Sequence, residues 1–300
     1  GRIEGTGGRE GGDGGFVGTS GKVSLDGPDM PFVSATAGAP GTWLIDPLNI
    51  VISATANQCV GLLGCVNGPN WTSNASPATL GANLITAALN AGQNVTITTG
   101  AVGPEDGDIT LLGSPVIQKS AGAADVTLTL SAHNDIGITA PISQTGGSAV
   151  GRLNVVLRAD SDNSGAGNVA LRTPITTGGG SIPARGRNVT VLGNLSSAGT
   201  GGRDGGAISL TASPSGALNI TATSLTSAGG TSTGAGRSGG DITLSGGSVT
   251  ARGITTSGGN AGGANNAGGR AGRVTLDSTG VTPSLALNGN VTARGGNATG

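Results

Sequence analysis

Short segments in which aliphatic and polar residues alternate recur along most of this chain. In one of them Ile242 and Leu244 flank Thr243, so the two aliphatic side chains face one way and the threonine faces the other. This two-residue period predicts half-buried β-strands. Most of these strands follow a glycine, and they are predicted at residues 93–97, 107–111, 124–128, 167–171, 186–191, 205–210, 239–244 and 271–276.

A second repeat is an aliphatic residue followed four positions later by Gly-Gly. Full matches begin at Ile3, Ile142, Ile175, Leu225, Ile254 and Val291, and a near match begins at Leu195. From Ile142 onward the successive intervals are 33, 20, 30, 29 and 37 residues. The shortest interval indicates the length of one complete turn. The additional residues of the longer turns are mostly glycine-rich, as in residues 258–272.

Together the two repeats predict an all-β solenoid, a parallel β-helix with glycine-rich loops at one corner. Rungs about 4.8 Å apart would place Ile242 near Val274, and would align Ile175, Leu195, Leu225 and Ile254 in one spine. We expect about ten rungs in residues 94–300, a shaft of roughly 50 Å. A sandwich or propeller is less favoured, because a sandwich needs antiparallel hairpins.

The whole chain, residues 1–300, is predicted to be one continuous β-helix that continues beyond both ends. Helical spacing occurs at residues 84–92, which form either a short helical turn or another rung segment. Two features near residue 45 have expected structural roles. Trp43 is expected to cover an aliphatic face, and Asp46 before Pro47 to fix a turn.

The composition agrees with a narrow core. Sixty-one residues are glycine and only 1% are aromatic, so small aliphatic side chains must fill the interior. The net charge is −1, which gives no basic excess for a nucleic-acid partner. The apolar runs are too short for a membrane-spanning helix. We identify no cofactor site.

Two cysteines, Cys59 and Cys65, lie in an insertion loop at residues 56–78. A local disulfide is the favoured interpretation, and two free thiols are the alternative. Leu62 and Leu63 between them form either an exposed apolar contact or a segment folded back over the shaft.

Three strings in the first third of the chain carry a family resemblance. They are GGDGGFVGTSGKVSL (11–25), GTWLIDPLNIVIS (41–53) and ANLITAALNAGQNVTITTG (82–100). In this order they resemble a block of the filamentous-haemagglutinin-like exoproteins of two-partner secretion systems. The chain departs from that block at Gly18, where an acidic residue is common, and in the cysteine-bearing insertion.

The resemblance covers about the first 100 residues, and the remainder is similar only in the style of its repeats. It implies a right-handed β-helix, export across a Gram-negative outer membrane with an outer-membrane secretion partner, and adhesion or aggregation. It also implies contact with a glycan or protein on a host or neighbouring cell.

Candidate chemistry is sparse. Stacking could bring Asp108 and Asp125 together as a calcium site or a carboxylate pair, but the simpler interpretation is that each caps a turn. His133, beside Asn134 and Asp135, is expected at a solvated corner rather than in a catalytic triad. Residues 7–15 fit a calcium-binding nonapeptide only in part. We therefore predict no catalytic residue and no metal site.

Four arginines, Arg9, Arg203, Arg237 and Arg270, share a place just before a predicted strand. Stacking the last three on adjacent rungs would form a basic ladder, which an anionic glycan or another filament could contact. The alternative is a set of solvated loop charges.

The function expected from these observations is that of a non-enzymatic filament or adhesin shaft, secreted to the surface of a Gram-negative cell. A fibre subunit that assembles head to tail or laterally, a carbohydrate-active β-helix enzyme and the stalk of a toxin-delivery protein are the alternatives.

Overall fold

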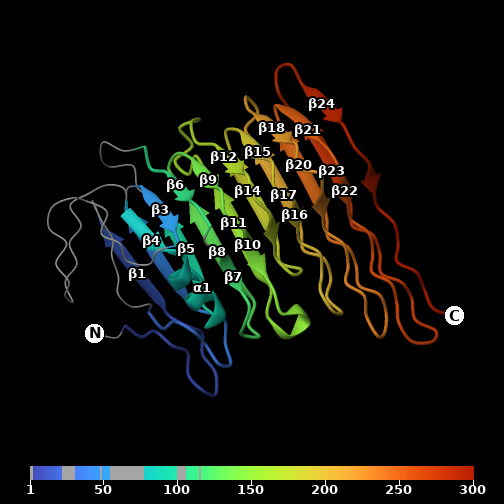
Figure 1. Ribbon diagram of the computed structural model, residues 1–300, viewed down its shortest axis with the longest axis horizontal. Coiled ribbons are helices and arrows are strands. Elements are labelled where there is room, and N and C mark those ends of the chain that lie inside the picture. Colours follow the sequence, from blue (N-terminus) through green and yellow to red (C-terminus); the bar gives the residue numbers. More distant parts are fainter. Residues whose placement is uncertain (1–2, 22–30, 48, 55–77, 100–105, 115) are drawn as a thin grey trace.

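The structure is a computed structural model that describes residues 3–21, 31–47, 49–54, 78–99, 106–114 and 116–300. Its strands form three parallel sheets that wind as a parallel β-helix, with the rungs following one another from the N-terminal to the C-terminal end (Figure 1). Every pairing between named strands is parallel, from the first, β1 with β2, to the last, β22 with β25. The predicted fold class is therefore confirmed, whereas the right-handed sense stays a prediction.

Sheet 1 has nine strands in a single spatial order. They are β1 (Phe16–Gly21), β2 (Thr42–Pro47), β5 (Asn94–Thr98), β8 (Val126–Ser131), β11 (Leu153–Arg158), β14 (Ile182–Gly186), β17 (Ile208–Ala212), β20 (Ile242–Gly246) and β23 (Val274–Ser278).

Sheet 2 also has nine strands. In spatial order they are β4 (Ala78–Gly81), β3 (Ile50–Ser53), β6 (Ile109–Leu111), β9 (Ile136–Ile138), β12 (Val169–Leu171), β15 (Val189–Val191), β18 (Ala217–Ile220), β21 (Ser248–Ala251) and β24 (Ser284–Leu287).

Sheet 3 has seven shorter strands. They are β7 (Ile117–Lys119), β10 (Ile142–Gln144), β13 (Ile175–Thr176), β16 (Leu195–Ser196), β19 (Leu225–Thr226), β22 (Ile254–Thr255) and β25 (Val291–Thr292).

The interior is a column of aliphatic side chains contributed by all three sheets. Ile175, Leu195, Leu225 and Ile254 pair in succession and are at most 1% exposed, which confirms the predicted spine. Ile242 pairs with Val274, as the alternation predicted. The column forms because β-branched and leucine side chains on one face of each strand bury against the equivalent residues of neighbouring rungs.

The expected number of rungs was wrong. From residue 94 onward sheet 1 has seven strands, so the chain makes seven turns there and spans about 30 Å. The eight similar strands of the sequence belong to two sheets: β6, β12 and β15 lie in sheet 2 and the others in sheet 1. In most of the eight, a small or Asx residue precedes the first aliphatic residue whichever sheet the strand joins, so the local pattern does not distinguish the corner before sheet 1 from the corner before sheet 2.

The N-terminal rungs depart from regular winding. Strand β4 follows β3 in the chain but lies on the opposite side of β3 from β6. Helix α1 (Ala82–Asn90) comes next and packs against β7 and β5. Thr86 Oγ1 accepts a hydrogen bond from Gln118 N–H at 3.1 Å, and Asn90 Oδ1 accepts one from Ser120 N–H at 2.8 Å. The helix therefore covers the edge of sheet 3, which blunts an exposed strand edge. Of the two interpretations of residues 84–92, the helix is confirmed.

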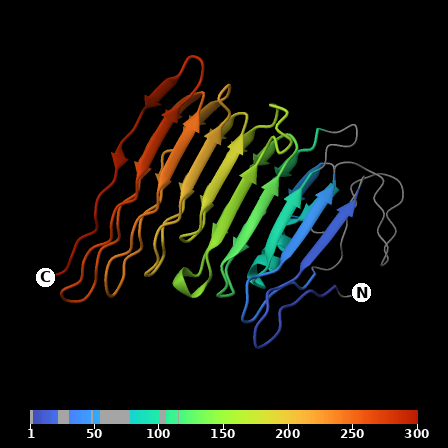
Figure 2. The same cartoon turned by 180° about the vertical axis from the view of Figure 1, so that it is seen from behind.

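The connections from sheet 3 to sheet 1 lengthen toward the C-terminal end, where they lie side by side in both views (Figures 1 and 2). The shortest is residues 177–181, between β13 and β14. We call the three longer connections that follow it, residues 197–207, 227–241 and 256–273, the glycine wing. In the part of the chain that the structure describes, no helix is long and apolar enough to span a membrane.

Candidate interaction surface

Buried polar residues form a column where the connections leave sheet 3. Each directly follows the paired residues of a sheet 3 strand or ends that strand, and the members are Lys119, Gln144, Thr177, Ser197, Ser227 and Thr256, all at most 4% exposed. Thr177 Oγ1 donates to the Gly180 carbonyl at 2.6 Å, and Ser197 Oγ donates to the Gly206 carbonyl at 2.6 Å. These bonds join the outgoing arm of a connection to its returning arm. They also meet the requirement that buried polar groups be hydrogen-bonded.

Lys119 carries the buried charge of this column. Its Nζ donates to the carbonyls of Leu89 and Ala121, both at 3.0 Å, and thereby satisfies a carbonyl in the last turn of α1. Burial lowers the pKa of Lys119, and the nearby charge of Asp125 opposes that shift.

The two arms of the glycine wing pack backbone against backbone. Gly259 N–H donates to the Arg237 carbonyl at 2.7 Å, and Gly230 N–H donates to the Arg203 carbonyl at 2.9 Å. A Cβ atom added at Gly269 would overlap the Arg237 carbonyl, so the close approach depends on the missing side chain. The Gly-Gly repeats therefore build ordered, stacked arms rather than loose loops.

The arginine ladder forms only in part. Gly205 N–H donates to the Ser238 carbonyl and Gly239 N–H to the Arg270 carbonyl, which aligns Arg203 with Arg237 but Arg270 with Ser238. The sequence contains this offset, because Arg203 and Arg237 lie five residues before a strand whereas Arg270 lies four residues before one.

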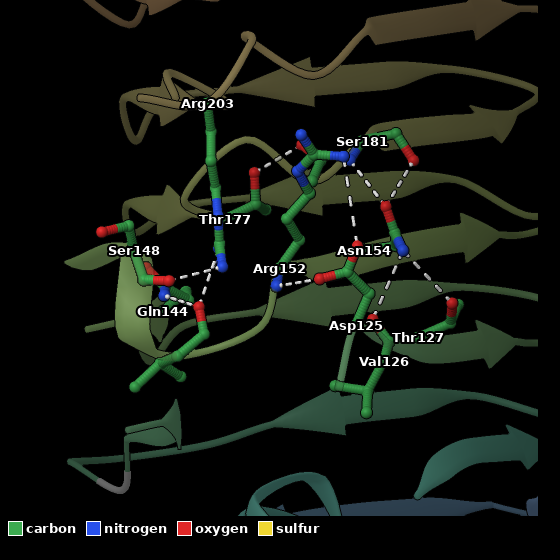
Figure 3. A network of polar contacts seen from close by, with 12 residues as sticks. Asp125, Val126, Thr127, Gln144, Ser148, Arg152, Asn154, Thr177, Ser181 and Arg203 are labelled. Atoms are coloured by element: carbon green, nitrogen blue, oxygen red, sulfur yellow. Dashed lines mark hydrogen bonds and ion pairs between the residues drawn. The ribbon is translucent and has the colours of Figure 1, made fainter. Parts of the chain in front are cut away.

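The side chain of Arg203 is also hydrogen-bonded within the protein (Figure 3). Its two terminal nitrogens donate to the Val150 carbonyl at 2.7 Å and the Ser148 carbonyl at 2.8 Å. These carbonyls belong to or follow the 3-10 turn η1 (Gly147–Ala149), two rungs away. Arg203 reaches across the short connection 177–181, whereas Arg237 and Arg270 are exposed.

The alternative arrangement, in which Asp108 and Asp125 would meet, does not occur. Asp108 precedes a sheet 2 strand and Asp125 precedes a sheet 1 strand, so they lie at different corners. Asp108 Oδ1 accepts from Asp135 N–H at 3.0 Å on the next rung, and Asp125 Oδ1 accepts from Arg152 N–H at 2.6 Å (Figure 3).

These bonds belong to ladders in which an Asp or Asn caps the equivalent backbone position of the following rung. The corner before sheet 2 continues from Asp135 to Asn168 N–H at 2.6 Å, and from Asn188 Oδ1 to Ala217 N–H at 2.9 Å. A capping role uses the short side-chain oxygen in place of a backbone acceptor. The corner aspartates thus fix the turns, as the simpler interpretation predicted.

The His133 side chain forms no hydrogen bond or ion pair with a serine or with Asp135 among the described residues. Its Nε2 lies 3.5 Å from Asp162 Oδ2 at a partly exposed corner. Desolvation raises the pKa of Asp162, but hydrogen bonds from Ser164 and the charge of His133 outweigh that effect and lower it below its ordinary value. Among the described residues, no group of three His, Cys, Asp or Glu side chains is arranged to hold a metal ion.

The remaining candidates have different outcomes. Trp43 is 4% exposed and joins the aliphatic core. Arg9 is exposed in the N-terminal segment, away from the glycine wing. Cys59, Leu62, Leu63 and Cys65 lie outside the described residues, as does the side chain of Asp46.

Sequence reasoning missed a groove on the outward face of sheet 1. It holds about 460 Å³ and is lined by Val156, Arg158, Pro183, Arg185, Ser209 and Thr211, together with Leu157 and Ala184. The strand register pairs Arg158 with Arg185 on adjacent rungs. The alternation within each strand indicates that Arg158 and Arg185 face outward. The register that pairs them could not be predicted, because it depends on the lengths of the corners between the strands.

No protein-family model matches the chain, and no curated protein matches it significantly. The resemblance to the filamentous-haemagglutinin-like exoproteins therefore remains a prediction from the quoted strings.

Proposed function

We propose that this chain is part of a secreted, surface-exposed structural filament, the shaft of an adhesin that resembles the filamentous-haemagglutinin-like exoproteins. The observation that supports the proposal is the aliphatic column that runs through successive rungs with equivalent residues paired. Such a stack is stiff along its axis, because each rung is hydrogen-bonded to both neighbours.

The arrangement of the exterior suits this role. The core takes one face of each strand, which leaves the outward faces and the connections free to make contacts. The connections vary in length without interrupting the column, from residues 177–181 to residues 256–273. A non-enzymatic shaft on the outside of a Gram-negative cell, exported with an outer-membrane partner, would use these surfaces for adhesion or aggregation.

A head-to-tail fibre is the second candidate function. In β24 Leu285 and Leu287 are 52% and 44% exposed, although they pair with the buried residues Val249 and Ala251 of β21. A further rung of the same shaft or another copy would cover these side chains and this strand edge, and the second arrangement would be a head-to-tail fibre.

Surface location is the decisive test of the first proposal. Intact producing cells should bind an antibody raised against the chain, and external protease should remove both the label and cell–cell aggregation. An unsecreted cytoplasmic protein serves as the control for lysis. Labelling that requires broken cells would contradict the proposal. Electron microscopy of the released protein would then separate single shafts from end-to-end fibres.

A further inference from the structure

The groove on sheet 1 carries two arginines without partners. Arg158 and Arg185 are exposed and pair in register, and neither guanidinium group forms a hydrogen bond or ion pair with the described residues. Two like charges at the separation of adjacent strands repel by about 1 kcal/mol in water. An anion placed between them would remove this repulsion and accept hydrogen bonds from both guanidinium groups.

No acidic side chain lines the groove, so its charge is not balanced locally. The two arginines lie in one outward column, and the residues directly before and after them in that column are uncharged. Arg158 pairs with Ser131, and Arg185 pairs with Thr211. The chain beyond residue 162 has nine arginines, three aspartates and neither glutamate nor lysine, so the C-terminal side of the groove is net basic, whereas Asp160 and Asp162 lie at the corner that follows Arg158.

The other lining groups match a sugar better than a simple ion. Val156 and Pro183 pair with uncharged residues and form a partly exposed apolar surface. Ser209 and Thr211 add hydroxyl groups. Pyranose rings present C–H faces to apolar surfaces and hydroxyls to polar ones. The volume of about 460 Å³ lies within the range of small-ligand sites, about 300–1,000 Å³.

We propose that this groove binds a carboxylate-bearing polysaccharide, with Arg158 and Arg185 contacting one uronate carboxylate and Val156 and Pro183 supporting the ring. This contact surface differs from the arginines of the glycine wing. The inference goes beyond the shaft function and does not depend on surface location.

The test uses the purified chain and polygalacturonate, with binding measured by calorimetry at fixed salt. We expect Arg158→Ala/Arg185→Ala to weaken binding at least about tenfold, equivalent to about 1.4 kcal/mol. The matched control, Arg237→Ala/Arg270→Ala, removes the same charge from exposed wing positions and should change affinity less than about twofold. Circular dichroism and the thermal midpoint establish that both variants fold.

Three further results would overturn the proposal. These are no binding of polygalacturonate by the parent chain, an equal loss in both double variants, and equal binding of polyglutamate. The last would assign the groove to acidic peptides instead. Dextran supplies the uncharged polysaccharide control, and we expect it to bind at least about tenfold more weakly. Failure here would leave the surface-labelling result unaffected, so the two proposals are tested separately.

Discussion

At the scale of single residues, the fold depends on a few polar groups placed inside an aliphatic column. Thr177, Ser197 and Thr256 each donate from a buried hydroxyl to a carbonyl on the returning arm. Lys119 lies in the same column, one rung before Gln144, with which it pairs. Because a buried donor without a partner costs about 1–3 kcal/mol, these positions accept few replacements.

Lys119 should give the shaft a measurable pH dependence. Its pKa is lowered in the fold by burial, so between that pKa and the ordinary value near 10.4 the unfolded chain holds more protons. Stability therefore rises with pH across this interval, and is lost as pH falls through the lowered pKa. We expect urea unfolding from neutral pH to about pH 10 to show the parent gaining stability relative to Lys119→Met. A pH-independent difference between the two proteins would contradict this assignment.

At the scale of elements, glycine has two separate roles in the wing. Some glycines allow the arms to touch, as Gly269 does against the Arg237 carbonyl. Others lie in open space, and at Gly234 an added Cβ would meet only the Ser232 hydroxyl at 4.0 Å. Glycine content alone does not distinguish the two roles, because the difference arises from what the neighbouring rung places opposite.

This difference predicts opposite outcomes for two alanine substitutions. Gly269→Ala forces the arms apart and should lower hydrogen-exchange protection across residues 256–272, with a loss of more than about 1 kcal/mol. Gly234→Ala should change stability by less than about 0.5 kcal/mol, since it neither overlaps a neighbour nor requires a left-handed backbone. Equal effects would show that the arms are not packed as described.

At the scale of the whole molecule, non-adjacent rungs are also connected. The connection 177–181 is too short to separate its neighbours, so Arg203 reaches η1 two rungs away. Gly201 lies beside Ser148 in the same contact. The longer connection that carries Arg203 thus contributes to packing, because it fills the space left beside the short connection 177–181.

Removing this bridge should weaken the middle of the shaft. Arg203→Ala loses two charge-assisted hydrogen bonds, and we expect unfolding free energy to fall by about 1.5–3 kcal/mol. Arg237→Ala, at the aligned but exposed position, should cost less than about 0.5 kcal/mol. Chemical denaturation of both variants measures the difference, and similar losses would mean that the bridge contributes little.

The sequence by itself determined the strand periods, the spine from Ile175 to Ile254, and the parallel stacking of like on like. These follow from alternation and repeat spacing, which are local properties of the chain. Only the tertiary structure decided which sheet each strand joins, where α1 lies, and that Arg158 meets Arg185. Each of these depends on the number of residues in every corner, because corner length sets the register of all following rungs. Corner length varies from rung to rung, so it produces no periodic pattern in the sequence.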